Sequence, residues 1–159
     1  MSKKVNIGVI GAGAWGTTIA KLLSEKNKNV LLWAKENHVK KNIEKIRINK
    51  IFLNDIALPK SLNITSSIYD MKTSDFLFVV TPTQYIESTL RPIRNIIKKS
   101  CVIVNCSKGI DIKSSALISD IIKRIFPQNT IGILSGPNFA HEIAQGKPTA
   151  SLIAAENIL

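Results

Sequence analysis

Long apolar runs, cysteine, histidine and acidic residues are all scarce in this sequence of 159 residues. No apolar run approaches the roughly 18–20 residues that a membrane-spanning helix needs, so we expect no membrane insertion. The N-terminal segment MSKKVNIGVIGAG starts with basic residues, but its apolar run is short and broken by glycine. We therefore interpret this segment as a strand rather than a signal peptide, and expect a cytoplasmic protein.

Only two cysteines and two histidines are available for disulfide or metal chemistry. Cys101 and Cys106 flank V-I-V-N in what reads as a buried strand, and an offset of five residues points their side chains to opposite faces. A disulfide between them is therefore not expected. His38 and His141 lie in unrelated segments, so the sequence offers no zinc ligand set. We predict buried, free thiols and no metal site.

Acidic residues are half as frequent as basic ones, and 22 Lys plus Arg against 11 Asp plus Glu give a formal net charge of +11. Such an excess is compatible with a nucleic-acid partner. However, the lysines are dispersed, arginines and interleaved aromatics are few, and no recognition motif accompanies the charge. We expect solvated helix faces, or a surface that favours an anionic ligand, and no nucleic-acid partner.

What the chain does contain is an alternation of short apolar runs with helical stretches. Pro59 breaks an irregular connection over residues 50–63, and Pro92 is expected to kink or divide one helix. The pattern predicts strands over residues 5–10, 30–33, 64–65, 76–80, 101–105, 131–134 and 150–154, and helices over 14–26, 36–49, 84–99, 114–125 and 138–144.

Strand runs that are apolar nearly throughout and alternate with helices indicate a parallel sheet covered on both faces. With right-handed crossovers this arrangement becomes a doubly wound, mainly parallel sheet of the Rossmann-like α/β class. The length of 159 residues suits a single domain, and we assign residues 1–159 to it.

Three glycines, Gly11, Gly13 and Gly16, are spaced G-x-G-x-x-G directly after the first strand and at the start of the first helix. This strand–turn–helix context is what a dinucleotide-binding fingerprint requires. Gly11 would permit the sharp turn, Gly13 would let backbone N–H groups approach a pyrophosphate, and Gly16 would let the helix pack closely on the strand. The N-terminus of the helix would face the phosphate charge. We predict a bound NADPH or NADH.

The end of the second strand bears on the choice between these two cofactors. The sequence there is Trp33-Ala34-Lys35-Glu36, with no acid directly at the strand end to bind a ribose 2′-hydroxyl. Lys35 suits a 2′-phosphate, although it is also an ordinary lysine at a helix start, and Glu36 keeps NADH possible. NADPH is modestly preferred.

Three further loops follow strands and are expected on the same edge of the sheet. Thr81-Pro82-Thr83 follows the fourth strand and either borders the cofactor or is an ordinary loop capped by Thr83. Lys108 follows the fifth strand, where an ammonium group can hold a phosphate or polarise a carbonyl oxygen. Gly136-Pro137 turns the chain before Asn138, which can cap the next helix. Together the loops suit a ligand crevice.

The segments GAGAWG near the N-terminus, CSKG at 106–109 and SGPNFAHEIAQGKPTA at 135–150 resemble one family, the bacterial NAD(P)-dependent glycerol-3-phosphate dehydrogenases. The resemblance covers essentially the whole chain, and the last segment is much more specific than the glycine motif. It implies reduction of dihydroxyacetone phosphate to sn-glycerol 3-phosphate, a phospholipid precursor, by a full-length homodimer.

The same resemblance assigns roles to residues around the cofactor. Ala14 and Trp15 would contact it from the glycine turn, and Ala140 would touch it from a later loop. Lys35 falls where the family often has Arg or His near the adenosine 2′-phosphate. Lys108 would meet both cofactor and substrate.

For the substrate, the resemblance implies contacts from Lys108, Gly136 and Asn138. The family often has Ser or Thr where this chain has Asn138. The proton-transferring lysine of the family lies in a helical C-terminal domain that these 159 residues do not contain, so no catalytic residue is assigned here. We therefore expect a chain that binds cofactor but is nearly inactive alone, with apolar residues near its end exposed to self-association: Leu152, Ile153, Ile158 and Leu159.

Two other functions fit the same cofactor motif. The first is a related dehydrogenase of the 6-phosphogluconate or ketopantoate reductase type. The second is a non-catalytic nucleotide-binding module such as a redox sensor.

Overall fold

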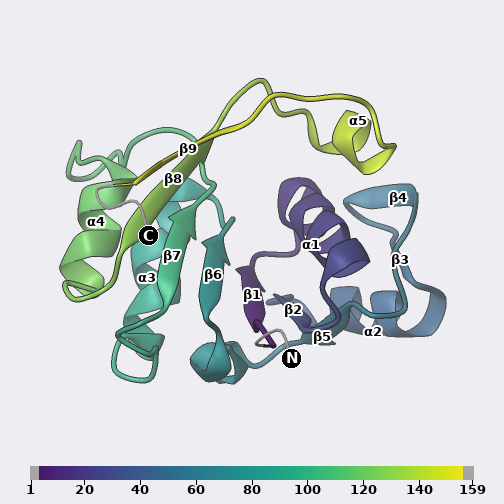
Figure 1. Ribbon diagram of the computed structural model, residues 1–159, viewed down its shortest axis with the longest axis horizontal. Helices are drawn as coiled ribbons and strands as arrows, with labels where there is room; N and C mark the ends of the chain where they lie inside the picture. The colour runs from purple at the N-terminus through teal and green to yellow at the C-terminus, as the bar shows by residue number, and fades with distance from the viewer. Residues whose placement is uncertain (1–3, 156–159) are drawn as a thin grey trace.

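A seven-stranded sheet forms the centre of the molecule in the computed structural model, which describes residues 4–155 (Figure 1). Its spatial order is β5-β2-β1-β6-β7-β8-β9, and every neighbouring pair is parallel except β8 and β9. The strands are β1 (Ile7–Ile10), β2 (Val30–Trp33), β5 (Asn63–Thr65), β6 (Phe76–Val79), β7 (Val102–Asn105), β8 (Ile131–Ser135) and β9 (Leu152–Ala155). The predicted doubly wound, mainly parallel Rossmann-like sheet is confirmed.

Helices cover both faces of this sheet because successive strand residues point to opposite sides. Within β1, Val9 packs on the side of α1 and α2, whereas Ile10 packs on the side of α3 and α4. The helices are α1 (Ala14–Lys26), α2 (Asn37–Ile46), α3 (Ile86–Leu90), α4 (Ile118–Ile125) and α5 (Ala140–Ala144), with single-turn 3₁₀ segments at Ile68–Thr73, Thr83–Tyr85 and Arg91–Ile93. The fifth helix is carried over the end of the sheet and lies beside α1 (Figure 1).

The chain leaves β1 toward β2 and β5, and then returns to β6 on the other side of β1. The order of the strands therefore reverses between β1 and β6. In open α/β sheets, ligands bind at the carboxyl ends of the strands at such a switch point. The topology thus predicts a ligand site at the loops that follow β1 and β6.

Residues 36–63 differ most from the sequence-based prediction. The helix expected over 36–49 ends at Ile46, because Arg47 adopts a left-handed conformation with φ of 55°. The guanidinium group of Arg47 then donates to the carbonyls of Pro59 and Leu62. A small antiparallel hairpin of β3 (Ile48–Asn49) and β4 (Leu53–Ala57) replaces much of the expected irregular connection. We call these two strands and their turn the hairpin.

Three other helices are shorter than predicted, and α5, expected over 138–144, begins at Ala140. The helix expected over 84–99 is divided into α3 and a 3₁₀ turn that contains Pro92, as the proline suggested. The helix expected from Ser114 begins only at Ile118. The carboxylate of Asp111 accepts hydrogen bonds from the backbone N–H and the hydroxyl of Ser114, and this turn replaces the first helical residues.

The two cysteines lie on opposite faces of the sheet and are free, as predicted. Cys101 belongs to the core beneath α3 and α4, and Cys106 to the core beneath α1 and α2. Burial raises the pKa of each thiol to about 12, so both are neutral at physiological pH.

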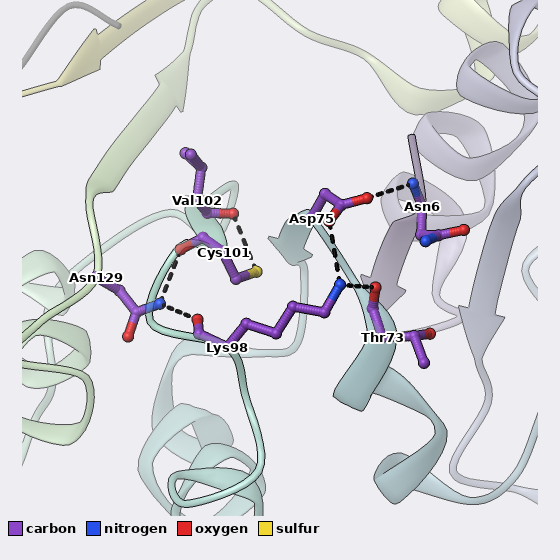
Figure 2. Close-up of polar contacts among 7 residues, drawn as sticks. All are labelled: Asn6, Thr73, Asp75, Lys98, Cys101, Val102 and Asn129. Atoms are coloured by element: carbon purple, nitrogen blue, oxygen red, sulfur yellow. Dashed lines mark hydrogen bonds and ion pairs between the residues drawn. The ribbon is translucent and has the colours of Figure 1, made fainter. Parts of the chain in front are cut away.

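A polar network joins the amino ends of β1, β6 and β7 (Figure 2). The ammonium group of Lys98 donates to the carbonyl of Thr73 and lies 3.1 Å from a carboxylate oxygen of Asp75. The other oxygen of Asp75 accepts from the backbone N–H of Asn6. Asn129, which is 5% exposed, donates from Nδ2 to the carbonyls of Lys98 and Cys101 at 2.8 Å, and of Lys99 at 3.3 Å. This network therefore links the strands at their amino ends, at the opposite end of the sheet from the glycine turn.

Candidate functional site: a dinucleotide cleft

The three motif glycines meet three different surroundings in the turn between β1 and α1. Gly11 has φ of 117°, and a Cβ there would lie 2.9 Å from the carbonyl oxygen of Val80. A Cβ on Gly16 would lie 1.8 Å from the carbonyl oxygen of Gly11, so α1 can approach the turn only because this residue is glycine. A Cβ on Gly13 would meet nothing within 4 Å. The turn is thus tight on its inner side and open above Gly13.

A cleft of about 880 Å³ opens above this turn, at the carboxyl ends of β1, β2, β6 and β7. Its size falls within the range of about 300–1,000 Å³ that small-molecule and cofactor sites occupy. It is lined by residues 11–16, Trp33, Lys35, Glu36, Phe52, 80–83, Tyr85, Ser88, Thr89, 106–108, Asn138 and Ala140. The structure therefore brings together all the site residues singled out from the sequence except Gly136.

Several residues that line this cleft carry a buried polar atom without a protein partner. Within residues 4–155, such atoms are the indole N–H of Trp15, the hydroxyl of Thr81, the Nδ2 of Asn138 and the Nε of Arg47. The first three belong to residues that line the cleft. A buried donor left unpaired costs free energy, so these atoms suit a polar ligand that pairs with them. Together with the open space above Gly13, they fit a dinucleotide.

The loop that carries Lys108 is held from the loop after β6. The hydroxyl of Thr83 donates to the carbonyl of Lys108 at 2.5 Å, and Thr83 is itself the first residue of the 3₁₀ turn rather than its cap. Gln84 donates to the carbonyl of Ile110 and accepts from the N–H of Ile112, both at 3.0 Å. These bonds hold the backbone of residues 108–112, the loop from which Lys108 lines the cleft.

The loop between β8 and α5 places Asn138 at the cleft but does not use it as a helix cap. The Oδ1 of Asn138 accepts from the hydroxyls of Ser151 at 3.0 Å and Thr149 at 3.3 Å, and α5 has no side-chain cap. The predicted cap is therefore wrong, because the segment before β9 engages that oxygen and Phe139 occupies the N-cap position of α5. Gly136 has φ of 146°, and a Cβ there would lie 2.5 Å from the carbonyl oxygen of Ala150. It shapes this loop without lining the cleft.

Sequence reasoning missed the contribution of the hairpin. Phe52 at its turn lines the cleft and is 45% exposed, while Asn49 at the end of β3 is buried against the glycine turn. The only local sequence signal for these residues was the short apolar run of residues 51–53 between the polar pairs Asn49-Lys50 and Asn54-Asp55.

The structure also bears on two sequence-based expectations, that of no metal site and that of no membrane-spanning helix. In the part of the chain that the structure describes, no group of three or more His, Cys, Asp or Glu side chains could hold a metal ion. None of the helices formed by residues 4–155 is long and apolar enough to span a membrane.

The strand order, the glycine turn and the cleft above it define the class of this protein: it is a Rossmann-type dinucleotide-binding domain. Residues 6–158 match the family model described as NAD-dependent glycerol-3-phosphate dehydrogenase N-terminus, and the chain belongs to this family of oxidoreductases.

Curated relatives agree with this assignment. The chain is 36% identical over 151 residues to glycerol-3-phosphate dehydrogenase (NAD(P)+) of Parvibaculum lavamentivorans, which covers 95% of this chain and 45% of that protein. It is 40% identical over 148 residues to the enzyme of the same name from Novosphingobium aromaticivorans, covering 93% of this chain and 44% of that protein. The chain therefore spans a little under half the length of these relatives.

Among solved structures, glycerol-3-phosphate dehydrogenase from Coxiella burnetii superposes with a TM-score of 0.90 at 25% identity. The match covers 97% of this chain and 47% of that chain.

Proposed function

We propose that residues 1–159 are the cofactor-binding domain of an enzyme that reduces dihydroxyacetone phosphate to sn-glycerol 3-phosphate with NADPH or NADH, a step in making glycerophospholipid precursors. The observation that carries the proposal is the cleft, which combines the open glycine turn with Lys108 and Asn138 from two other loops. Membership of the family supports the choice of substrate.

In this proposal the glycine turn holds the pyrophosphate. Backbone N–H groups at Gly13 and Ala14 and the N-terminus of α1 supply donors and a positive potential for an anion. Trp15 and Ala140 contact the cofactor from two sides of the cleft. Lys35 lies on the rim after β2 and pairs with a 2′-phosphate, so NADPH is modestly preferred over NADH.

The substrate lies between Lys108 and the β8–α5 loop. When bound, the reduced nicotinamide supplies the hydride for the substrate carbonyl. The ammonium group of Lys108 binds the phosphate or the carbonyl oxygen, and the unpaired Nδ2 of Asn138 donates a hydrogen bond to the substrate. Gly136 helps by setting the path of the loop that carries Asn138.

We further propose that a polypeptide of these 159 residues is nearly inactive alone. Hydride transfer to a carbonyl needs a positioned acid for the forming alkoxide, and the proposal assigns that group to the part of the enzyme that these residues do not span. Leu152 and Ile153 are 69% and 57% exposed on β9, which suits contact with another apolar surface; Ile158 and Leu159 lie outside the described residues. The homodimer of the full-length form and its cytoplasmic location stay predictions.

Calorimetric titration of the chain with NADPH and NADH separately tests the binding proposal. We expect both to bind, NADPH more tightly, and binding of neither by folded protein would contradict the proposal. A turnover assay with dihydroxyacetone phosphate and NADPH tests the proposed inactivity of the isolated chain. A rate near that of a full-length enzyme would contradict it.

A further inference from the structure

The hairpin reaches the glycine turn through one buried side chain, Asn49. This residue ends β3 and is 1% exposed. Its Nδ2 donates to the carbonyl of Ala12 at 2.9 Å and to the hydroxyl of Thr17 at 2.8 Å. Its Oδ1 accepts from the backbone N–H of Phe52 at 3.4 Å, which ties the same side chain to the hairpin turn.

These bonds determine the direction of one peptide group in the turn. The carbonyl of Ala12 also accepts from the hydroxyl of Thr17 at 3.3 Å, so two side chains hold it on the side of the hairpin. The peptide between Ala12 and Gly13 is trans, and in a planar trans peptide the N–H points opposite to the carbonyl. Holding the carbonyl of Ala12 toward Asn49 therefore turns the N–H of Gly13 away from the hairpin.

Gly13 lines the cleft and has open space where a side chain would be. With its N–H turned away from the hairpin, this residue can donate to an anion bound above the turn. If the carbonyl of Ala12 were not held, the peptide could rotate and the N–H of Gly13 would sample other directions. Binding a phosphate would then carry the additional cost of ordering this peptide.

The hairpin that carries Asn49 is anchored on its far side. Leu53 and Ile56 of β4 pack against Ala144 of α5. The carboxylate of Asp55 lies 2.7 Å from the Nε2 of His141 on the same helix. The hairpin that carries Asn49 is therefore also held by α5, in addition to the bonds of Asn49 to the glycine turn.

We propose that Asn49 is a positioning residue of the dinucleotide site: it fixes the Ala12–Gly13 peptide so that the N–H of Gly13 faces the pyrophosphate. The inference rests on the proposed function, because it assumes that the turn binds a pyrophosphate.

Asn49→Ala tests the inference, with Asn129→Ala as the matched control. Both residues are buried asparagines whose Nδ2 donates to main-chain carbonyls, but Asn129 lies at the opposite end of the sheet (Figure 2). Dissociation constants are measured for NADPH and for adenosine 2′-monophosphate, which has the adenosine end of NADPH without a pyrophosphate. Thermal unfolding of each variant is recorded alongside.

We expect Asn49→Ala to raise the Kd for NADPH about tenfold, which corresponds to about 1.4 kcal/mol, and to leave the Kd for adenosine 2′-monophosphate unchanged. Asn129→Ala should lower the Tm and change neither Kd. If Asn49→Ala does not fold, Thr17→Val removes the hydroxyl that holds both Asn49 and Ala12, and should raise the Kd for NADPH about threefold, again without affecting adenosine 2′-monophosphate.

Three results would overturn the inference: unchanged NADPH affinity in the folded Asn49 or Thr17 variant, an equal loss for both ligands, or an equal loss in Asn129→Ala. In each case the unaltered chain still binds NADPH and the proposed function stands. Failure of the unaltered, folded chain to bind either NADPH or NADH would instead contradict the proposed function, and the inference with it.

Discussion

Replacing Gly13 by alanine should weaken cofactor binding while leaving stability nearly unchanged. Gly13 has φ of −69° and ψ of −178°, which any residue adopts, and a Cβ there meets nothing within 4 Å. Alanine restricts the unfolded chain more than glycine does, which stabilises by about 0.4–1 kcal/mol at a compatible position. Gly13 is also the N-cap of α1, where alanine is less favourable than glycine by a similar amount, so we expect the Tm to stay within about 2 °C of that of the unaltered chain.

In the same variant the new methyl group fills the space through which a pyrophosphate would reach the turn. A phosphate oxygen that accepts from an N–H of the turn lies about 2.9 Å from the nitrogen, so the pyrophosphate sits close against the backbone and a Cβ in the open space above Gly13 would crowd it. We expect the Kd for NADPH to rise at least tenfold, which corresponds to about 1.4 kcal/mol or more. Differential scanning calorimetry and isothermal titration of the same preparation measure the two effects.

Gly16→Ala is the matched control, since its Cβ would lie 1.8 Å from the carbonyl oxygen of Gly11. Backbone must move to admit it, so this variant should lower the Tm. If Gly13→Ala bound NADPH as tightly as the unaltered chain, the cleft above the turn would not be the pyrophosphate site. A Tm lowered in Gly13→Ala as far as in Gly16→Ala would refute the open space assigned to Gly13.

Two further predictions concern the cleft rim and the buried thiols. Lys35→Ala should raise the Kd for NADPH about fivefold, the upper limit for one exposed charge pair, and leave the Kd for NADH unchanged. The control Lys41→Ala, on α2, should change neither Kd. An equal loss of affinity for both cofactors in Lys35→Ala would contradict the role of Lys35. Burial raises the pKa values of Cys101 and Cys106 from 9.0 to about 12, so as pH rises the thiols ionise in the unfolded chain before they ionise in the folded chain. The free energy of unfolding should therefore fall as pH rises from about 9 to about 12. Urea unfolding at about pH 8 and about pH 10 checks this, and a Cys101→Ala/Cys106→Ala variant with the same decrease would exclude the thiols as its cause.

The features that sequence predicted well have local causes. Apolar, β-branched runs specify the strands, and the strand–glycine–helix order specifies the turn, because both patterns depend on neighbouring residues. The opposite faces of Cys101 and Cys106 follow from the two-residue repeat of a strand alone. The positions of Lys35 and Lys108 on the cleft follow from parallel strands ending at one edge.

The features that sequence reasoning missed depend on tertiary contacts. The hairpin has a first strand of only two residues with an irregular register, and it exists because Arg47 ends α2 and bonds to carbonyls twelve and fifteen residues later. Asn138 has the residue type of a helix cap, but its side-chain oxygen accepts a hydrogen bond from Ser151, just before β9. Asn49 looked like an ordinary polar residue in a connection, because its partners lie 37 and 32 positions away.

The most direct test of the cofactor cleft is a crystal structure of this chain grown with NADPH. We expect the pyrophosphate against the backbone of Gly13 and Ala14 at the start of α1, and the 2′-phosphate beside Lys35. A cofactor bound outside the cleft of residues 11–16 and 106–108, with the glycine turn free of phosphate, would contradict the site described for this protein.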